Sequence, residues 1–284
     1  MTRLAVVTPS YAPDFDLCAD LNRSVLAHSG DDVHHHIVVA ARDLALFARL
    51  AGPRTHIRRA SDHLPRGFVP VPRTNLTLNL RRPFPPLRGW ITQQIVKLAV
   101  TAGFDADAVL LVDSDIEFIR PFGPQTYLRD EVVRFYRKPD AVDESLPRHL
   151  SWHRVARELL GLPPARPPFH DYISAPVAWS PTIVRRLQHR IEMVTGQAWA
   201  DAIGARLHFS EATLYGVFVD EVLGAPATAN SSAQMLCHNH YDEVPLDAPA
   251  LRRFLAEVAP ADVAVMISAK SQTPLELRRQ ALRG

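Results

Sequence analysis

Two carboxylates, Asp113 and Asp115, are the residues whose type and spacing best suit chemistry. They flank Ser114 and directly follow the apolar residues 108–112. A run that is apolar on both faces is typical of a central parallel strand, and ligands of open α/β sheets bind beyond the carboxyl ends of such strands. Residues i and i+2 of an extended segment point the same way, so the two carboxylates repel each other unless a cation lies near them. We predict a site for Mg²⁺ or Mn²⁺ that bridges substrate phosphates; the alternative is an acidic turn whose side chains cap backbone amides.

The first fifty residues predict the start of a parallel α/β sheet that can position this motif. Strands are expected over residues 3–8 and 36–40. Helical stretches are expected over residues 17–26 and, after the second strand, up to residue 50. The His34-His35-His36 run is best explained as the beginning of that second strand. Six prolines between residues 65 and 86 exclude a long helix and predict a loop or irregular excursion.

The later elements complete the predicted domain. Apolar spacing predicts a helix over residues 90–103, with Gln94 and Lys97 on a face beside its apolar stripe. Further helices are predicted over residues 151–160, over residues 180–194 and from Ser210 onward, and strands over residues 131–136 and 263–267. We expect a single mixed α/β domain over residues 1–284, with a mostly parallel central sheet flanked by helices. Residues 1–120 would form the half that binds nucleotide and metal, and residues 121–284 the acceptor half and C-terminal elements.

Composition excludes several other classes of protein. The hydrophobic fraction of 47% can supply a core, and the formal net charge of +2 is too small to indicate nucleic-acid binding. No apolar run reaches the roughly 18 residues needed to span a membrane. The N-terminus lacks the long apolar core and cleavage site of a signal peptide, so we expect a cytoplasmic protein. The two cysteines form no CxxC pair and indicate neither a zinc cluster nor a disulfide framework.

Several blocks together resemble the GT-A fold glycosyltransferases, in particular a bacterial family of GT-A-like proteins. The resemblance covers most of the chain, and the order of its blocks makes it more specific than the short Asp-x-Asp alone. The blocks are Thr8-Pro9-Ser10-Tyr11, Gln93-Gln94-x-x-Lys97-Leu98, Val109-Leu-Leu-Val-Asp113-Ser-Asp115, Ser210-Glu211-x-x-Leu214-Tyr215-Gly216 and Ser268-Ala269-Lys270-Ser271.

This resemblance implies transfer of a hexosyl or pentosyl group from a UDP- or GDP-linked sugar to a small-molecule or glycan acceptor, assisted by Mn²⁺ or Mg²⁺. The implied donor site combines the two carboxylates with Thr8, Pro9, Ser10, Tyr11, Asp43, Gln94, Lys97 and Ser114. Asp43 would meet the base or ribose, and the alternative is a helix N-cap. Lys97 would approach the phosphates as a point charge, and the alternative is a solvated helix lysine.

The resemblance also directs attention to a third metal ligand and a general base. Relatives often take a late histidine as ligand; His238 is our choice and His240 the alternative, since both share one face if the segment is extended. Inverting transfer, which we favour, needs a base near the acceptor. Glu211, in the first turn of the helix after Ser210, is the expected base, and its alternative role is helix capping. Asp171 is the second candidate.

Other interpretations stay open at this level. Trp152, Trp179 and Tyr215 could stack on a sugar ring or pack in the core. A haloacid dehalogenase phosphatase would carry its Asp-x-Asp near the N-terminus. A nucleotidyltransferase would be expected to carry a glycine-rich loop after the first strand, and residues 8–11 contain no glycine. A non-catalytic nucleotide- or sugar-binding module of the same fold is the remaining alternative.

Overall fold

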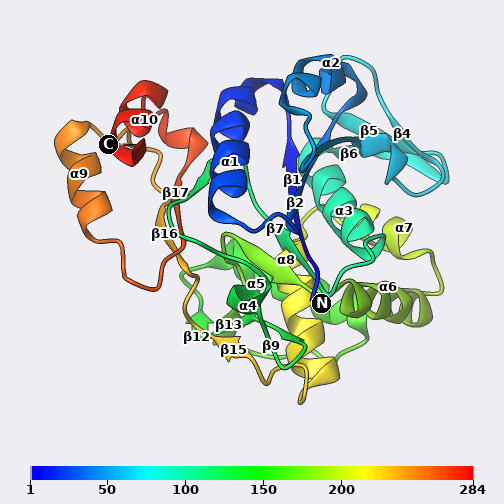
Figure 1. Ribbon diagram of the computed structural model, residues 1–284. Helices are drawn as coiled ribbons and strands as arrows, with labels where there is room; N and C mark the ends of the chain where they lie inside the picture. Colours follow the sequence, from blue (N-terminus) through cyan, green and yellow to red (C-terminus); the bar gives the residue numbers. More distant parts are fainter. Residues whose placement is uncertain (1, 284) are drawn as a thin grey trace.

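A mostly parallel sheet forms the centre of the protein, with helices on both sides (Figure 1). The computed structural model describes residues 2–283, in which the central sheet has five strands in the order β14-β7-β1-β2-β3. Strands β1, β2, β3 and β7 run parallel, and β14 pairs with β7 in the antiparallel direction. The predicted mixed α/β architecture with a mostly parallel sheet is therefore confirmed.

The elements follow one another along the described chain as two series. The strands are β1 (Leu4–Ser10), β2 (His34–Val39), β3 (Thr55–Arg59), β4 (Phe68–Pro70), β5 (Leu76–Asn79), β6 (Arg82–Arg88), β7 (Ala108–Leu111), β8 (Ile116–Phe118), β9 (Leu128–Arg129), β10 (Val132–Val133), β11 (Phe135–Tyr136), β12 (Lys138–Val142), β13 (Phe169–Asp171), β14 (Val177–Trp179), β15 (Ser231–Ser232), β16 (Cys237–His240) and β17 (Ala264–Ile267). The α-helices are α1 (Phe15–His28), α2 (Leu44–Phe47), α3 (Gly89–Ala102), α4 (Pro124–Tyr127), α5 (Pro147–Leu160), α6 (Pro181–Thr195), α7 (Trp199–Gly204), α8 (Glu211–Val217), α9 (Ala248–Ala256) and α10 (Leu275–Arg283).

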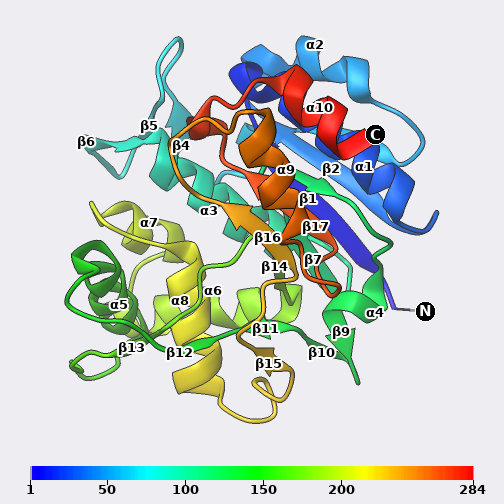
Figure 2. The same ribbon diagram turned by 90° about the vertical axis from the view of Figure 1, so that its left-hand side faces the viewer.

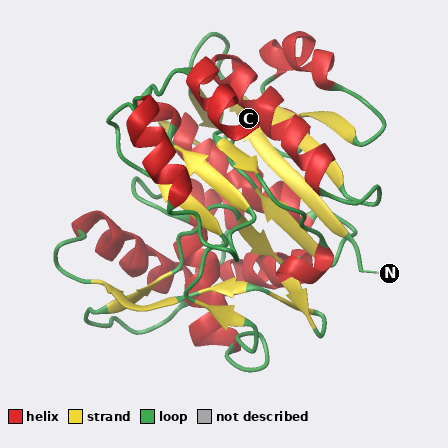
Figure 3. Ribbon diagram, turned by 60° about the vertical axis from the view of Figure 1, so that its left-hand side comes forward, coloured by secondary structure: helices red, strands yellow, loops and turns green. Residues whose placement is uncertain are grey.

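Alternation along β1 shows how the sheet is buried on both faces. Ala5 and Val7 pack in the core beneath α3, α6 and α8, whereas Leu4 and Val6 pack beneath α1 and the strands β8, β16 and β17. This two-sided burial is what the apolar runs of β1 and β7 predict. Figure 3 shows helices on either side of the strands, and the core beneath α3 contains residues from both halves of the chain.

The C-terminal elements complete a smaller sheet beside the first. β17 pairs in parallel with β16 and antiparallel with β8, the strand that follows the Asp-x-Asp motif. Helices α9 and α10 cover its outer face, and Arg279 of α10 donates to Asp20 of α1 at 2.8 Å. This pairing brings residues late in the chain next to Asp115.

The proline-rich excursion contains regular structure that we did not predict. Residues 68–88 form an antiparallel sheet, β4–β5–β6, where we expected a loop or irregular segment. Prolines do exclude a helix here, but four of the six occupy the outer strands of this small sheet, where missing amide donors interrupt few ladder bonds. The short strands β3 and β14 were also missed, whereas the Ser180 and Ser210 helix caps are confirmed by their bonds to Ile183 N and Thr213 N.

The sheet order creates one place suited to ligand binding. From β1 the chain proceeds to β2 and β3 on one side and later returns to β7 on the other side. Loops after β1 and β7 therefore diverge, and this divergence is where open α/β sheets bind ligands. Ser10 ends β1 and Asp113 lies just after β7 at this place.

Candidate functional site

Lys97 joins the two halves of the chain at the ends of β1 and β7. Its Nζ lies 3.2 Å from Asp113 Oδ1 and 3.3 Å from Glu211 Oε1. The side chains of Lys97 and Glu211 are only 15% and 14% exposed, whereas Asp113 is 56% exposed. The cluster is therefore a partly buried ion triad with one carboxylate open to solvent.

Helix α3 holds this triad in place through Gln94 and Lys97, which lie one turn apart roughly on one side of the helix. Gln94 is buried, and its Oε1 accepts from the backbone N–H of Glu211 at 2.8 Å. The Ser210 side chain accepts from Thr213 N at the same helix start. Gln94 thus fixes the beginning of α8, and in this structure it faces protein rather than the predicted donor site.

The charge of Lys97 is set by two opposing effects. Burial disfavours the ammonium, but the charges and hydrogen bonds of Asp113 and Glu211 outweigh burial and raise the pKa of Lys97. Lys97 therefore stays protonated at physiological pH. It can stabilise an anion but cannot accept a proton.

Asp115 is anchored more deeply than Asp113. Its Oδ2 accepts from Ala269 N at 2.8 Å, and its backbone oxygen accepts from Arg278 Nη2 at 3.0 Å. Burial and the charge of Asp113 raise the pKa of Asp115, although the Ala269 N–H opposes this change. The predicted Ser268-Ala269-Lys270-Ser271 block therefore reaches the motif through its backbone.

Ser114 turns away from the carboxylates. It is buried, and its Oγ donates to Ser10 Oγ at 2.9 Å, which ties the end of β1 to the end of β7. Ser10 and Ser114 are brought together as predicted, but their hydroxyls bind each other.

The carboxylate pair alone does not form a complete metal site in the described chain. No group of three His, Cys, Asp or Glu residues able to hold a metal occurs among residues 2–283. Mg²⁺ and related ions, however, are commonly bound by one or two carboxylates together with substrate phosphates rather than by a complete protein cage. Asp113 and Asp115 are two carboxylates close enough for the Asp113 charge to add to burial in raising the pKa of Asp115.

The side chains of the two histidines considered as third ligands contact α9 and the loop before it. His238 and His240 do share one face of β16, as predicted, but that face is covered by α9. The His238 ring packs 4.4 Å from the Phe254 ring, and His240 Nε2 bonds to the Val244 carbonyl at 3.0 Å. Neither joins a metal-binding group in the described chain. The alternation was correct, but it could not show which face of the strand meets the motif.

The remaining donor-site residues divide into buried and exposed groups. Thr8 and Pro9 are buried within β1, and Thr8 Oγ1 bonds to His35 Nε2 at 2.9 Å, so these two support the sheet from inside. Tyr11 is exposed beyond the strand end. Asp43 is buried and accepts from Ala12 N at 3.3 Å, and its side chain makes no N-cap bond to its own helix, the alternative role considered for it. Asp43 therefore shapes the turn after β1.

Asp171 lies on β13 and is half-buried. Its Oδ1 accepts from Ile173 N at 3.0 Å, and its charge acts on His149, Tyr136 and Tyr241. Within residues 2–283, Asp171 makes no hydrogen bond or ion pair with Lys97 or Glu211. The structure therefore keeps the two base candidates in different environments.

Three further side chains near the motif were not singled out from sequence. Burial and then the Asp113 charge raise the pKa of Asp14. Desolvation is also the main cause that raises the pKa of Tyr241, and the Asp113 charge adds to it. Asn239 Oδ1 is buried without a hydrogen-bond partner in the described chain. The period-2 alternation of residues 237–241 could have identified Asn239 and Tyr241, because they lie on the strand face opposite His238.

The sequence matches one family of known proteins over most of its length. A family model matches residues 4–259, and its description is a family of unknown function, DUF6492. This chain belongs to the DUF6492 family. No curated protein matches it.

The DUF6492 match includes the whole ion triad of Lys97, Asp113 and Glu211. Ala269 and Arg278, which hold Asp115, lie beyond the matched residues. The family assignment therefore covers the carboxylates and α8, and the C-terminal support for Asp115 is additional.

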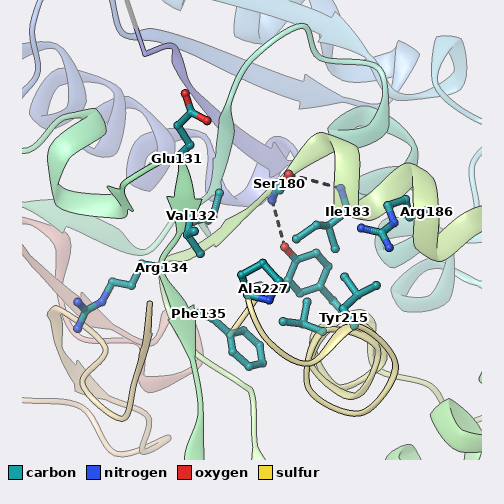
Figure 4. A pocket seen from close by; sticks show the side chains of 13 residues that line it. Glu131, Val132, Arg134, Phe135, Ser180, Ile183, Arg186, Tyr215 and Ala227 are labelled. Carbon is teal, nitrogen blue, oxygen red and sulfur yellow. Dashed lines mark hydrogen bonds between the residues drawn. The ribbon is translucent and has the colours of Figure 1, made fainter. Parts of the chain in front are cut away.

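Two cavities of this DUF6492 protein lie away from the triad. One of about 240 Å³ is lined by residues 131–135, the start of α6 and the end of α8 (Figure 4). Figure 4 shows Tyr215 pointing its hydroxyl at the Ser180 backbone nitrogen, a bond of 3.1 Å. Tyr215 also stacks on buried Trp179 at 4.9 Å, so these two aromatics belong to the core.

The second cavity, of about 360 Å³, is lined by a paired charge network. Arg137 Nε donates to Asp220 at 2.6 Å, and the Arg157 guanidinium pairs with Glu221 at 2.6 Å. Because Arg137 and Arg157 each have a carboxylate partner on the π-helical turn Phe218–Leu223, we interpret these two pairs as support for that turn. Neither cavity includes Lys97, Asp113 or Glu211.

The third aromatic candidate, Trp152, has a different environment. It is buried on α5, stacks on His149 at 4.7 Å and lies 6.0 Å from Trp90. Arg148 lies over both indole rings. Trp90 is the second residue of α3, so this aromatic cluster lies near the helix that carries Lys97.

Proposed function

We propose that this DUF6492 protein is a GT-A-like, metal-dependent glycosyltransferase. It would move a hexosyl or pentosyl group from a UDP- or GDP-linked sugar to a hydroxyl of a small-molecule or glycan acceptor. The observation that carries this proposal is the Lys97 ammonium between Asp113 and Glu211, at the point where the strand order diverges. Cation and carboxylates at that point suit a diphosphate on one side and a reacting hydroxyl on the other.

The donor side is supported by the charges around Asp113. A diphosphate placed beyond β1 and β7 would meet the Lys97 charge and the exposed Asp113 carboxylate. Asp113 and Asp115 would hold Mg²⁺ or Mn²⁺, which neutralises charge on a diphosphate leaving group when bound. Tyr11 and Asp14, just after β1, would border the nucleoside.

The acceptor side is supported by Glu211. Its carboxylate starts α8, where the helix dipole favours the anion, and Lys97 holds one of its oxygens. When Glu211 takes a proton from the acceptor hydroxyl, Lys97 keeps its second partner, Asp113. One cation can thus remain compensated before and after proton transfer, which suits an inverting reaction with Glu211 as base.

A thermal-shift screen tests the donor site directly. We expect UDP or GDP to raise the melting temperature only with Mn²⁺ present, whereas ADP should have little effect. Ligand at a hundred times its dissociation constant stabilises a protein by about 2.7 kcal/mol. Asp113→Asn should remove the shift. Asp105→Asn is the matched control, because Asp105 is fully exposed and pairs with Arg3 at the opposite end of β7.

Three outcomes would contradict the proposal. An equal shift without metal would exclude a metal-dependent site. A shift with nucleoside triphosphates but not with diphosphates or nucleotide sugars would favour a nucleotidyltransferase. Binding of a nucleotide sugar without release of nucleoside diphosphate, with water and a panel of sugar acceptors, would favour a non-catalytic binding module.

A further inference from the structure

The small sheet β4–β5–β6 has one buried face and one bare apolar face. Thr77, Asn79, Phe68 and Leu87 lie on the buried face, as their cross-strand register requires. The intervening side chains of Val69, Leu76 and Leu80 lie on the other face and are exposed. Leu80 is 63% exposed, and Phe84 at the β6 edge is 78% exposed. Exposed apolar side chains gathered in this way mark an interaction surface.

The same segment is strongly basic. No Asp or Glu occurs between Asp62 and Asp105, and the sheet with its loops carries Arg66, Arg73, Arg81, Arg82 and Arg88. Arg81 pairs with Asp201 at 3.0 Å. The side chains of Arg66, Arg73 and Arg82 are exposed and have no ion-pair partner within residues 2–283. Apolar side chains and uncompensated positive charge are therefore both exposed on this small sheet and its loops.

The sheet is held firmly enough to present these side chains as a unit. Asn79 Nδ2 donates to Asp201 Oδ1 at 2.8 Å, and Arg88 Nη2 donates to the Leu207 carbonyl at 2.6 Å. Figure 2 shows β5 and β6 extending from the body of the molecule, with α3 following directly. A surface bound to β4–β6 would thus border the helix that carries Lys97.

We infer that the exposed part of the β4–β5–β6 sheet, with its loops, docks on an anionic lipid surface. Phe, Leu and Val side chains gain free energy by entering the headgroup boundary, and arginines beside them are attracted to acidic headgroups. A second copy of this chain fits poorly, because pairing two such faces would bring their unpaired arginines together. Double-stranded nucleic acid would use the arginines but leave Val69, Leu76 and Leu80 without an apolar partner.

Vesicle co-sedimentation with the full chain tests this inference. At low salt, the protein should sediment with vesicles of phosphatidylcholine and phosphatidylglycerol, and much less with phosphatidylcholine alone. Added salt should weaken binding by screening the arginines. Phe84→Ser should reduce partitioning about tenfold or more, since it removes a whole aromatic side chain from the boundary. Arg82→Glu should reduce it about fivefold or more.

Matched variants keep the test specific. Met193→Ser removes an apolar side chain that is 70% exposed on α6, and Arg252→Glu reverses an exposed charge on α9. Both should bind vesicles as the unchanged protein does. Absence of sedimentation at low salt, equal sedimentation with neutral vesicles, or equal loss in Phe84→Ser and Met193→Ser would overturn the inference. The inference would also be overturned if the protein bound duplex DNA or self-associated in place of binding vesicles, and if that binding depended on Phe84 and Arg82. The measurement needs neither nucleotide nor turnover, so it is independent of the proposed enzymatic activity.

Discussion

At the scale of single residues, Lys97 determines what Asp113 and Glu211 can do. Its two ion pairs keep it protonated, so it cannot be the base, and this leaves a carboxylate for that role. Glu211 is the stronger candidate because it lies beside the motif through Lys97. Asp171 instead accepts a hydrogen bond from Ile173 N in its own turn.

Glu211→Gln separates these roles. The amide oxygen can still accept from Lys97, so the fold and the Mn²⁺-dependent thermal shift with diphosphate should persist. Sugar transfer should fall about 100-fold or more, because the amide cannot take up the acceptor proton. The measurement is release of nucleoside diphosphate from the donor that the thermal-shift screen identifies. Near-normal turnover in Glu211→Gln together with loss in Asp171→Asn would assign the base to Asp171 instead.

At the scale of elements, the position of α8 depends on a close approach that only glycine permits. A Cβ at Gly216 would overlap the ring of Tyr172, whose hydroxyl donates to Asp220 at 2.8 Å. Gly216 thus lets α8 lie against Tyr172, the residue that follows β13, while Glu211, at the other end of the helix, reaches Lys97. This explains physically why a glycine stands at the end of the Ser210–Gly216 block.

Gly216→Ala should therefore destabilise the protein, although helix propensity alone favours alanine over glycine. In an unconstrained helix, alanine stabilises by about 1 kcal/mol relative to glycine. Here the overlap with Tyr172 should make the free energy of unfolding about 2 kcal/mol smaller, as expected for overpacking of a core. Urea unfolding monitored by tryptophan fluorescence measures this change. Gly52→Ala is the control, because a Cβ there meets no atom within 4 Å; a similar free energy for both variants would contradict the close approach.

At the scale of the whole molecule, a buried polar network joins α1 to the first three strands. His35 Nδ1 lies 2.8 Å from Asn22 Oδ1, which also accepts from Thr55 Oγ1 at 2.9 Å, and His35 Nε2 bonds to Thr8 Oγ1. Since Asn22 Oδ1 only accepts, His35 donates from Nδ1 and accepts from Thr8 as a neutral ring. Burial lowers the pKa of His35 from 6.5 to about 3.

This lowered pKa predicts a dependence of stability on pH. The unfolded chain protonates His35 below pH 6.5 while the folded chain does not, so the contribution of neutral His35 is present above pH 6.5 and is lost as pH falls from 6.5 towards 3. The loss is roughly 1.4 kcal/mol for each pH unit. Free energies of unfolding in urea at pH 7 and pH 5 measure it. His35→Gln can keep both hydrogen bonds without titrating, so its pH dependence should be shallower; an unchanged dependence would show that His35 does not contribute.

Local patterns in the sequence were sufficient for much of the fold. The apolar residues 108–112 identified a central strand, and the serines at 180 and 210 marked helix starts, because burial on two faces and N-capping are read directly from neighbouring residues. The position of Asp113 at a strand end followed from the same pattern. Local patterns did not predict the β4–β6 sheet, because cross-strand pairing depends on residues that are separated along the chain.

Within the candidate site, the residue types came from the sequence, and the contacts between them came from the tertiary structure. Periodicity places Lys97 on one side of α3 and His238 on one side of β16, but it does not say which element covers that side. Packing brings α8 against Lys97, so Glu211 joins Asp113, whereas α9 covers His238 and removes it from the motif. Thr8 and Gln94 became internal supports for the same reason: their faces meet His35 and α8. The sequence by itself determined which side chains could react, and the packing of distant elements decided which of them meet.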